Sequence, residues 1–164
     1  MTESNPSTEA PSPSGIGGWL ILPMLGLLVT PVRMAIEFYL SFVPVLFSAQ
    51  GWDYVSSPDR HAWFRPFIIA ECVVNVALFV FTLWLIYLFF TKARRVPGLF
   101  ITWLVATFLA QVADVVGAAG LLGSPPTGAD VRDLGRSLVS AIIWIPYFMV
   151  SKRVKNTFVQ EGWA

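Results

Sequence analysis

Four apolar runs, each a candidate to cross a bilayer as a helix, constrain the fold of this chain more than any other feature. The runs cover residues 16–47, 67–90, 98–122 and 138–150. A hydrocarbon core about 30 Å thick is crossed by about 20 helical residues at 1.5 Å per residue. Backbone inside lipid must satisfy its own hydrogen bonds, and a helix does so within one segment. The chain is therefore predicted to be an all-α integral membrane protein.

Composition places the chain in the same class and excludes others. Charged residues make up 13% of the 164 residues and hydrophobic residues 55%, whereas a soluble domain carries about 25% charge. The net charge of +1, with no basic stripe interleaved with aromatic residues, gives no surface for nucleic acid. Cys72 is the only cysteine, so an internal disulfide or a cysteine-rich metal site is excluded. The partner that composition predicts is the lipid bilayer.

Prolines and flanking residues set the expected bounds of the spans. Pro31 and Pro44 interrupt the first run, which is too long for one upright span. The fourth run is short and reaches spanning length only by including polar neighbours on both sides. The first fourteen residues are too polar to bury enough surface to become ordered. We therefore predict a disordered tail at residues 1–14, a four-helix transmembrane domain at 15–158 with spans at 17–40, 67–90, 98–122 and 134–153, and a short C-terminal tail at 159–164.

Positive charges in the loops predict the orientation in the membrane. Loops on the cytoplasmic side carry an excess of Lys and Arg. Six of these residues lie between the second and third runs or after the fourth, and four lie in the other loops. We therefore expect both termini in the cytoplasm and the aromatic segment 48–65 on the outer surface. The six are Lys92, Arg94, Arg95, Lys152, Arg153 and Lys155, and the four are Arg60, Arg65, Arg132 and Arg136.

Polar side chains fall at similar depth in all four predicted spans, in the half nearer the outer surface. Within each span they recur at spacings of three and four residues, which places them on one helical face. If these faces point inward, they surround a polar pocket that opens toward the outer side. The candidate site for a ligand or a proton is Arg33, Glu37, Glu71, Asn75, Gln111, Asp114, Arg136 and Ser140.

The charges of this candidate site do not cancel. A charge at the centre of a membrane helix costs roughly 2.5–3.5 kcal/mol, so each one needs a partner. Arg33 and Arg136 oppose the carboxylates of Glu37, Glu71 and Asp114, which leaves one carboxylate over. Either one carboxyl group binds a proton or a cation, or Arg65 supplies the missing positive charge. A purely structural network that fixes which helices pack together is the alternative interpretation.

No catalytic or cofactor motif accompanies the candidate site. The sequence has no P-loop, no His-Glu-x-x-His and no Gly-x-Ser-x-Gly. His61 is the only histidine, whereas zinc needs three or four ligands. We therefore expect no metal, no cofactor and no catalytic residue. An intramembrane enzyme that uses Glu71 or Asp114 as an acid or a base is an alternative that nothing in the sequence supports specifically.

Two segments resemble a known bacterial family. The first is Gly15-Ile16-Gly17-Gly18-Trp19-Leu20, at the start of the first span. The second is Ile143-Trp144-Ile145-Pro146-Tyr147-Phe148, followed by Ser151-Lys152-Arg153-Val154-Lys155-Asn156-Thr157-Phe158. Together they resemble the family called domain of unknown function 2569, small four-span inner-membrane proteins, over about residues 15–158. The resemblance implies four helices in a bacterial cytoplasmic membrane, and it implies no activity, so no catalytic residue is carried over.

Two functions fit these observations. The first is a non-enzymatic membrane protein that works by interaction, as a subunit, accessory protein or scaffold; small size and the lack of catalytic motifs favour it. The second is a binder or carrier of a proton, a cation or a small polar molecule; the outer-half polar cluster favours it. Besides lipid, we expect a second membrane protein as a partner, and a homodimer is consistent with the lipid-facing surface that four short spans leave.

Overall fold

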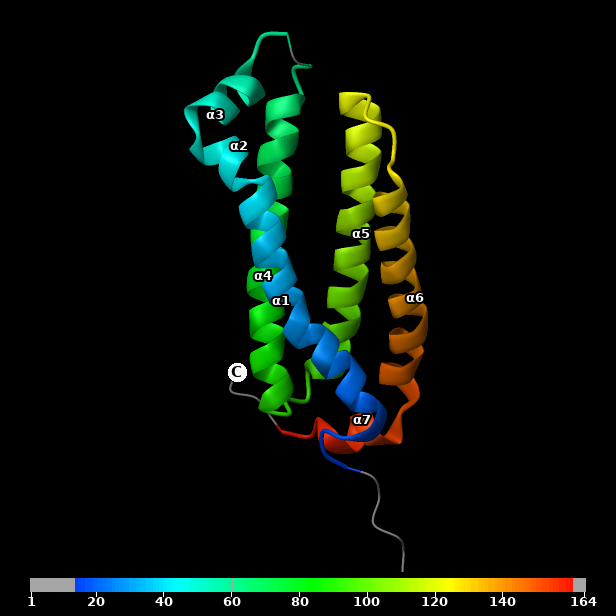
Figure 1. Cartoon of the computed structure of the whole chain (residues 1–164). Coiled ribbons are helices and arrows are strands. Elements are labelled where there is room, and N and C mark those ends of the chain that lie inside the picture. Colours follow the sequence, from blue (N-terminus) through cyan, green and yellow to red (C-terminus); the bar gives the residue numbers. More distant parts are fainter. Residues whose placement is uncertain (1–13, 60, 161–164) are drawn as a thin grey trace, which may run out of the picture.

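The structure is a bundle of four long helices with shorter helices at its ends (Figure 1). The computed structural model describes residues 14–59 and 61–160, so most of the two predicted tails lies outside the described residues. In the described part no strand forms, and four helices are long and apolar enough to cross a membrane. The prediction of an all-α, four-helix membrane bundle is confirmed. The long helices are α1 (Ile21–Ser41, preceded by the 3₁₀ turn η1, Gly18–Leu20), α4 (Phe64–Phe90), α5 (Val96–Leu122) and α6 (Gly128–Val150); the short ones are α2 (Val43–Phe47), α3 (Ala49–Ser56) and α7 (Lys152–Thr157).

The two ends of the bundle carry different elements (Figure 1). One end, here called the α7 end, holds α7 and the turn between α4 and α5. The other, here called the α3 end, holds α2, α3 and the loop between α5 and α6. Along the bundle, α5 packs against both α4 and α6, and α1 packs against α4.

Helix α6 begins at Gly128, ahead of the predicted residue 134, because a capping box starts it. The Thr127 hydroxyl accepts the Asp130 backbone N–H at 3.3 Å, and the Asp130 carboxylate accepts the Thr127 backbone N–H at 2.7 Å. These bonds satisfy N–H groups that a helix start otherwise leaves unpaired. As a result Arg132, counted above as a loop residue, and Asp133, which precedes the predicted span, lie within the helix.

The same helix ends at Val150 instead of continuing to residue 153. Ser151 has extended backbone angles, and its hydroxyl accepts the backbone N–H of Val154 at 3.4 Å. Ser151 thereby caps a separate short helix, α7, which crosses the end of the bundle (Figure 1). The basic residues Lys152, Arg153 and Lys155 are therefore not part of the fourth span.

The hydrophobic core lies toward the α7 end. The rings of Phe100 and Phe148 stack with centroids 4.2 Å apart, and Phe89 meets Phe158 edge to face at 5.1 Å. Aromatic pairs of this kind add about 0.5–1.5 kcal/mol beyond the area they bury. The buried cluster is Leu20, Leu27, Leu85, Phe89, Ala93, Val96, Phe100, Trp103, Leu104, Phe148, Val154 and Phe158.

The first and last described segments of the chain meet at the α7 end. The Thr157 hydroxyl donates to the Gly15 carbonyl at 3.2 Å. Gln160 pairs with the α4–α5 turn: Arg94 N–H donates to the Gln160 carbonyl at 2.8 Å, and Gln160 N–H donates to the Lys92 carbonyl at 3.2 Å. The first and last described segments therefore lie at the same end of the bundle. That this end faces the cytoplasm stays a prediction from the loop charges.

Candidate functional site

The polar residues of the candidate site lie toward the α3 end, beyond the buried core. A buried hydrogen bond marks the boundary: the Trp103 indole N–H donates to the Thr82 hydroxyl at 2.9 Å. Beyond Leu104 no residue of α5 is buried, and the same holds for α4 between Phe64 and Thr82. Side chains there are partly exposed, which leaves room for polar groups between the helices.

Arginines and carboxylates of α1 and α6 form one chain of ion pairs. Arg33 Nε lies 2.8 Å from Glu37 Oε1, one turn along α1, and Arg33 Nη2 lies 4.0 Å from Asp133 Oδ2 on α6. Asp133 Oδ1 in turn lies 3.5 Å from Arg136 Nη1. Two positive and two negative charges therefore neutralise one another. Asp133 is not among the residues predicted for the site, because the predicted fourth span begins one residue after it. The Thr127-x-x-Asp130 capping pattern is the signal in the sequence that places Asp133 in the helix.

Glu71 on α4 and Asp114 on α5 form a separate carboxyl pair. Each lies one turn from the contact between Phe67 on α4 and Gly117 on α5, so the two carboxyl groups share one seam between the helices. Among the described residues no Lys, Arg or His makes an ion pair with either one. Arg65 was one predicted counter-charge for the remaining carboxylate. Its guanidinium instead lies over the ring of Trp52, 5.1 Å from the ring centre. The structure therefore leaves two carboxyl groups without a described counter-charge, where the sequence predicted one.

Three uncharged residues of the predicted site remain, namely Asn75, Gln111 and Ser140, and they differ in how close they lie to the carboxyl pair. The Gln111 side-chain oxygen is buried and has no hydrogen-bond partner among the described residues. Gln111 lies three residues before Asp114 and so shares its helical face. The Asn75 amide donates to the Glu71 backbone carbonyl at 3.0 Å and is thus engaged within α4. Ser140, on α6, is partly buried. Gln111 is therefore the uncharged residue with an unused acceptor close to the pair.

A small cavity of about 110 Å³ gives access to Asp114. Besides Asp114 it is lined by Thr127, Asp130 and the loop residues Ser124, Pro125 and Pro126. The three loop residues are exposed, so the cavity is reached from the α3 end. Its volume is sufficient for a few water molecules. Asp130, which also caps α6, lines this cavity together with Asp114.

A close helix contact lies one turn beyond the carboxyl pair. A Cβ atom at Gly117 on α5 would overlap the ring of Phe67 on α4, so only glycine permits this approach. Phe67 precedes Glu71 by four residues, and Gly117 follows Asp114 by three. All four residues therefore lie along the same α4–α5 seam. The contact holds the two helices together next to the acids.

The predicted buried charge network is corrected by these observations. Among the described residues no charged side chain is buried, and the side chains of the ion-pair chain are 43–67% exposed. The physical reason is the packing order: α1 packs on α4 and α6 packs on α5, so the halves of the helices nearer the α3 end do not enclose a common core. The predicted cluster divides into an α1–α6 ion-pair chain and an α4–α5 carboxyl pair.

Metal ligands do not gather in the described part of the chain. No group of three His, Cys, Asp or Glu side chains there is placed to hold a metal ion. The His61 ring nitrogen accepts the backbone N–H of Trp63 at 3.3 Å, so this histidine takes part in a local turn. That the protein uses no metal and no cofactor stays a prediction.

Comparison with known proteins identifies the family. The family model described as protein of unknown function (DUF2569) matches residues 13–159. The inner membrane protein YdgK of Escherichia coli strain K12 is 34% identical over 152 residues, which cover 90% of this chain and 96% of that protein. No solved structure matches the chain. Together with the four apolar helices, this relative confirms the prediction of a multi-pass inner-membrane protein. The chain belongs to the family of domain of unknown function 2569.

Proposed function

We propose that this inner-membrane protein is not an enzyme and that it binds a proton or a small monovalent cation at the Glu71–Asp114 carboxyl pair. One observation carries the proposal. Glu71 on α4 and Asp114 on α5 lie on the same α4–α5 seam, one turn from the contact between Phe67 and Gly117, and no described cation forms an ion pair with either of them. Two unit charges of like sign 4 Å apart repel by about 4 kcal/mol at an effective dielectric constant of 20. A single bound positive charge removes this repulsion.

The surroundings of the pair support a small ligand. The cavity beside Asp114 supplies a route for water or an ion from the α3 end. The unused Gln111 oxygen supplies a neutral acceptor, which a bound cation or a protonated carboxyl group satisfies. A multivalent metal needs three or more converging ligands, and none of the described residues provide such a group. The chemistry therefore favours a proton or a monovalent ion.

Infrared spectroscopy of the full chain in liposomes tests the proton-binding form of the proposal. We expect the stretching band of a protonated carboxyl group to titrate with pH and to disappear in both Glu71→Gln and Asp114→Asn, because each variant removes one half of the pair. Glu37→Gln is the matched control, since Glu37 is paired with Arg33 at 2.8 Å. In this control the titrating band should remain.

Thermal unfolding tests the cation-binding form. The melting midpoint is measured in sodium, potassium or choline chloride at constant ionic strength. A bound ion stabilises the folded state by mass action, so sodium or potassium should raise the midpoint of the wild type above its value in choline, and not that of Glu71→Gln. A wild type that shows neither a titrating band nor an ion response would refute the proposal, as would loss of the band in Glu37→Gln.

A second function, as a subunit or accessory protein, is favoured by a different observation. The ion-pair side chains of α1 and α6 are 43–67% exposed, and the acyl chains of lipids offer charged groups no partner. A second membrane protein or a second copy of the chain would cover them.

A photo-crosslinker at Val139 on α6, one turn from Arg136, tests this idea in native membranes. The matched control position is Val80 on α4; both side chains are exposed, by 56% and 58%. Protein adducts should form at residue 139 only, and equal yields at both positions would contradict it.

A further inference from the structure

A partly buried arginine rests on two glycines at the α7 end. A Cβ atom at Gly17 would lie 3.0 Å from Arg153 Nη1, and one at Gly18 would lie 3.4 Å from Arg153 Cζ. Gly18 also has φ +55°, a conformation that side chains with a Cβ rarely adopt. The glycine pair therefore leaves the space that the guanidinium of Arg153 occupies against the backbone of η1. This contact joins the two sequence segments that carry the family resemblance.

No described carboxylate neutralises this guanidinium. Among the described residues Arg153 makes no ion pair, and every described Asp and Glu lies away from the α7 end. Exposed Lys152 and Lys155 flank Arg153, and Arg95 lies at the same end. The described residues at this end therefore carry a net positive charge, and packing holds one of these cations, Arg153, in place. The described acids are Glu37, Asp53, Asp59, Glu71, Asp114, Asp130 and Asp133.

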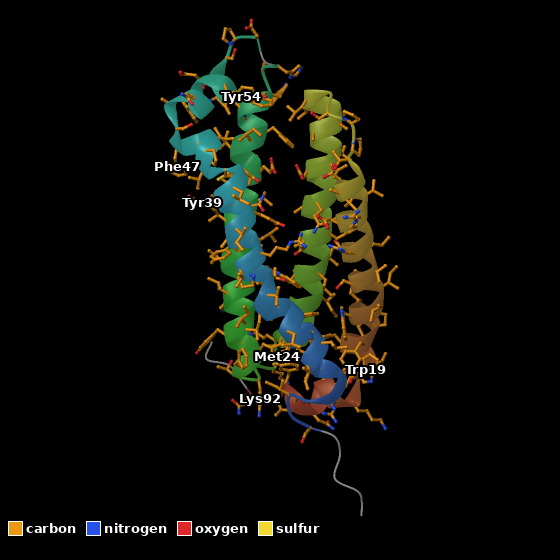
Figure 2. All side chains as sticks on the ribbon, in the orientation of Figure 1. Trp19, Met24, Tyr39, Phe47, Tyr54 and Lys92 are labelled. Carbon is orange, nitrogen blue, oxygen red and sulfur yellow. The ribbon has the colours of Figure 1, made fainter. Side chains whose placement is uncertain are left out.

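A shallow, open apolar hollow lies next to the guanidinium. Gly18, Trp19 and Leu22 line it, and Gly18 also contacts Arg153. Trp19 is 71% exposed and Leu22 is 50% exposed, and Figure 2 shows Trp19 at the α7 end, at the start of α1. Exposed tryptophan at the end of a membrane span is typical of the membrane–water interface. A fixed cation and an apolar wall that leads into the membrane are thus adjacent.

We infer that the hollow lined by Gly18, Trp19 and Leu22, together with the adjacent guanidinium of Arg153, is a binding site for an anionic phospholipid. The lipid phosphate pairs with the guanidinium of Arg153, whose fork of N–H donors suits a phosphate. An acyl chain runs along Trp19 and Leu22 into the bilayer. The apolar wall favours a lipid over free phosphate, which would gain nothing from it. Basic pockets of this kind beside membrane helices bind lipid headgroups. This site is independent of the carboxyl pair proposed above.

The test uses the full chain purified in a neutral detergent. Its melting midpoint is measured with dioleoyl phosphatidylglycerol, with dioleoyl phosphatidylcholine and with inorganic phosphate. At a tenfold excess over Kd, phosphatidylglycerol should raise the midpoint by about 3–6 °C. Phosphatidylcholine and inorganic phosphate should raise it by less than half as much. Arg153→Gln should lose most of the phosphatidylglycerol shift, and Arg95→Gln, which removes the same charge from the same end, should keep it.

Each other outcome refutes the inference in a distinct way. Equal losses in Arg153→Gln and Arg95→Gln would show a diffuse surface field with no site. Equal shifts with both lipids would show general solvation by lipid, and an equal shift with inorganic phosphate would show a site for a free anion. If Arg153→Gln does not fold, Trp19→Ala decides, because Trp19 is largely exposed and is not needed for the core. An unchanged phosphatidylglycerol shift in Trp19→Ala would overturn the inference.

Discussion

Substitution of Gly117 by alanine should destabilise the protein through one identifiable contact. A Cβ atom at this position would overlap Phe67 Cε2, lie 2.7 Å from Cζ and lie 3.1 Å from Cδ2. Ordinary contact begins at 3.4 Å, so the Phe67 ring must move or α4 and α5 must separate. Overpacking of this kind typically costs about 1–3 kcal/mol. We expect Gly117→Ala to lower the free energy of unfolding by that amount.

A double-mutant cycle isolates the contact. Phe67→Ala removes the ring that the new methyl group meets, so Gly117→Ala should cost less than about 0.5 kcal/mol in that background. Unfolding of all four proteins is followed by circular dichroism in the same detergent. Gly120→Ala, at a site where a Cβ would meet nothing within 4 Å, is the control and should be neutral or slightly stabilising. Costs that simply add in the double variant would refute the reasoning.

Three further substitutions test other parts of the fold, each by the unfolding free energy in detergent. Thr82→Val leaves the buried Trp103 indole N–H without its acceptor at 2.9 Å and should lower the free energy of unfolding by about 1–3 kcal/mol. A smaller loss in a Trp103→Phe background would support the lost hydrogen bond as the cause, and an equal loss would contradict it. Thr127→Ala removes the capping hydroxyl of α6 and should cost about 1 kcal/mol, with faster hydrogen exchange confined to the first turn; protection that stays unchanged there would argue against the cap. Asp133→Asn weakens two ion pairs whose side chains are half exposed. The loss should stay below about 1 kcal/mol where water surrounds these side chains; a loss well above that value would show that they are shielded from water.

The spans and their polar faces could be predicted from the sequence because both depend on local rules. Apolar length located the first three long helices, and the fourth was located once polar neighbours were added to its short apolar run, since backbone in lipid must be helical. Helical periodicity placed Glu71 and Asp114 on the faces along which α4 and α5 meet in the structure. The position of α6 was less accurate, because hydropathy treats Asp130 and Asp133 as loop residues whereas the capping box brings them into the helix.

The sequence did not predict which charged side chains of the site pair with each other, because the pairing depends on how the helices rotate and pack. Nothing local assigns Arg33 to Asp133 rather than to Glu71, and nothing local places Arg65 over Trp52. The contact between Arg153 and the Gly17–Gly18 backbone joins segments at opposite ends of the chain. Such contacts follow from side-chain shape across helix interfaces, which one sequence does not specify.

The positions of the two proposed sites bear on how they should behave together. The carboxyl pair lies toward the α3 end and Arg153 at the α7 end, with the buried core of Leu85, Phe89 and Phe100 between them. Sites with no shared contacts usually contribute independently to stability. Arg153→Gln should therefore leave the carboxyl titration unchanged, and Glu71→Gln should leave the lipid shift unchanged. Coupling between the two would require a change that passes through this core, and the hydrogen bond between Trp103 and Thr82 at its boundary would be the first contact to examine.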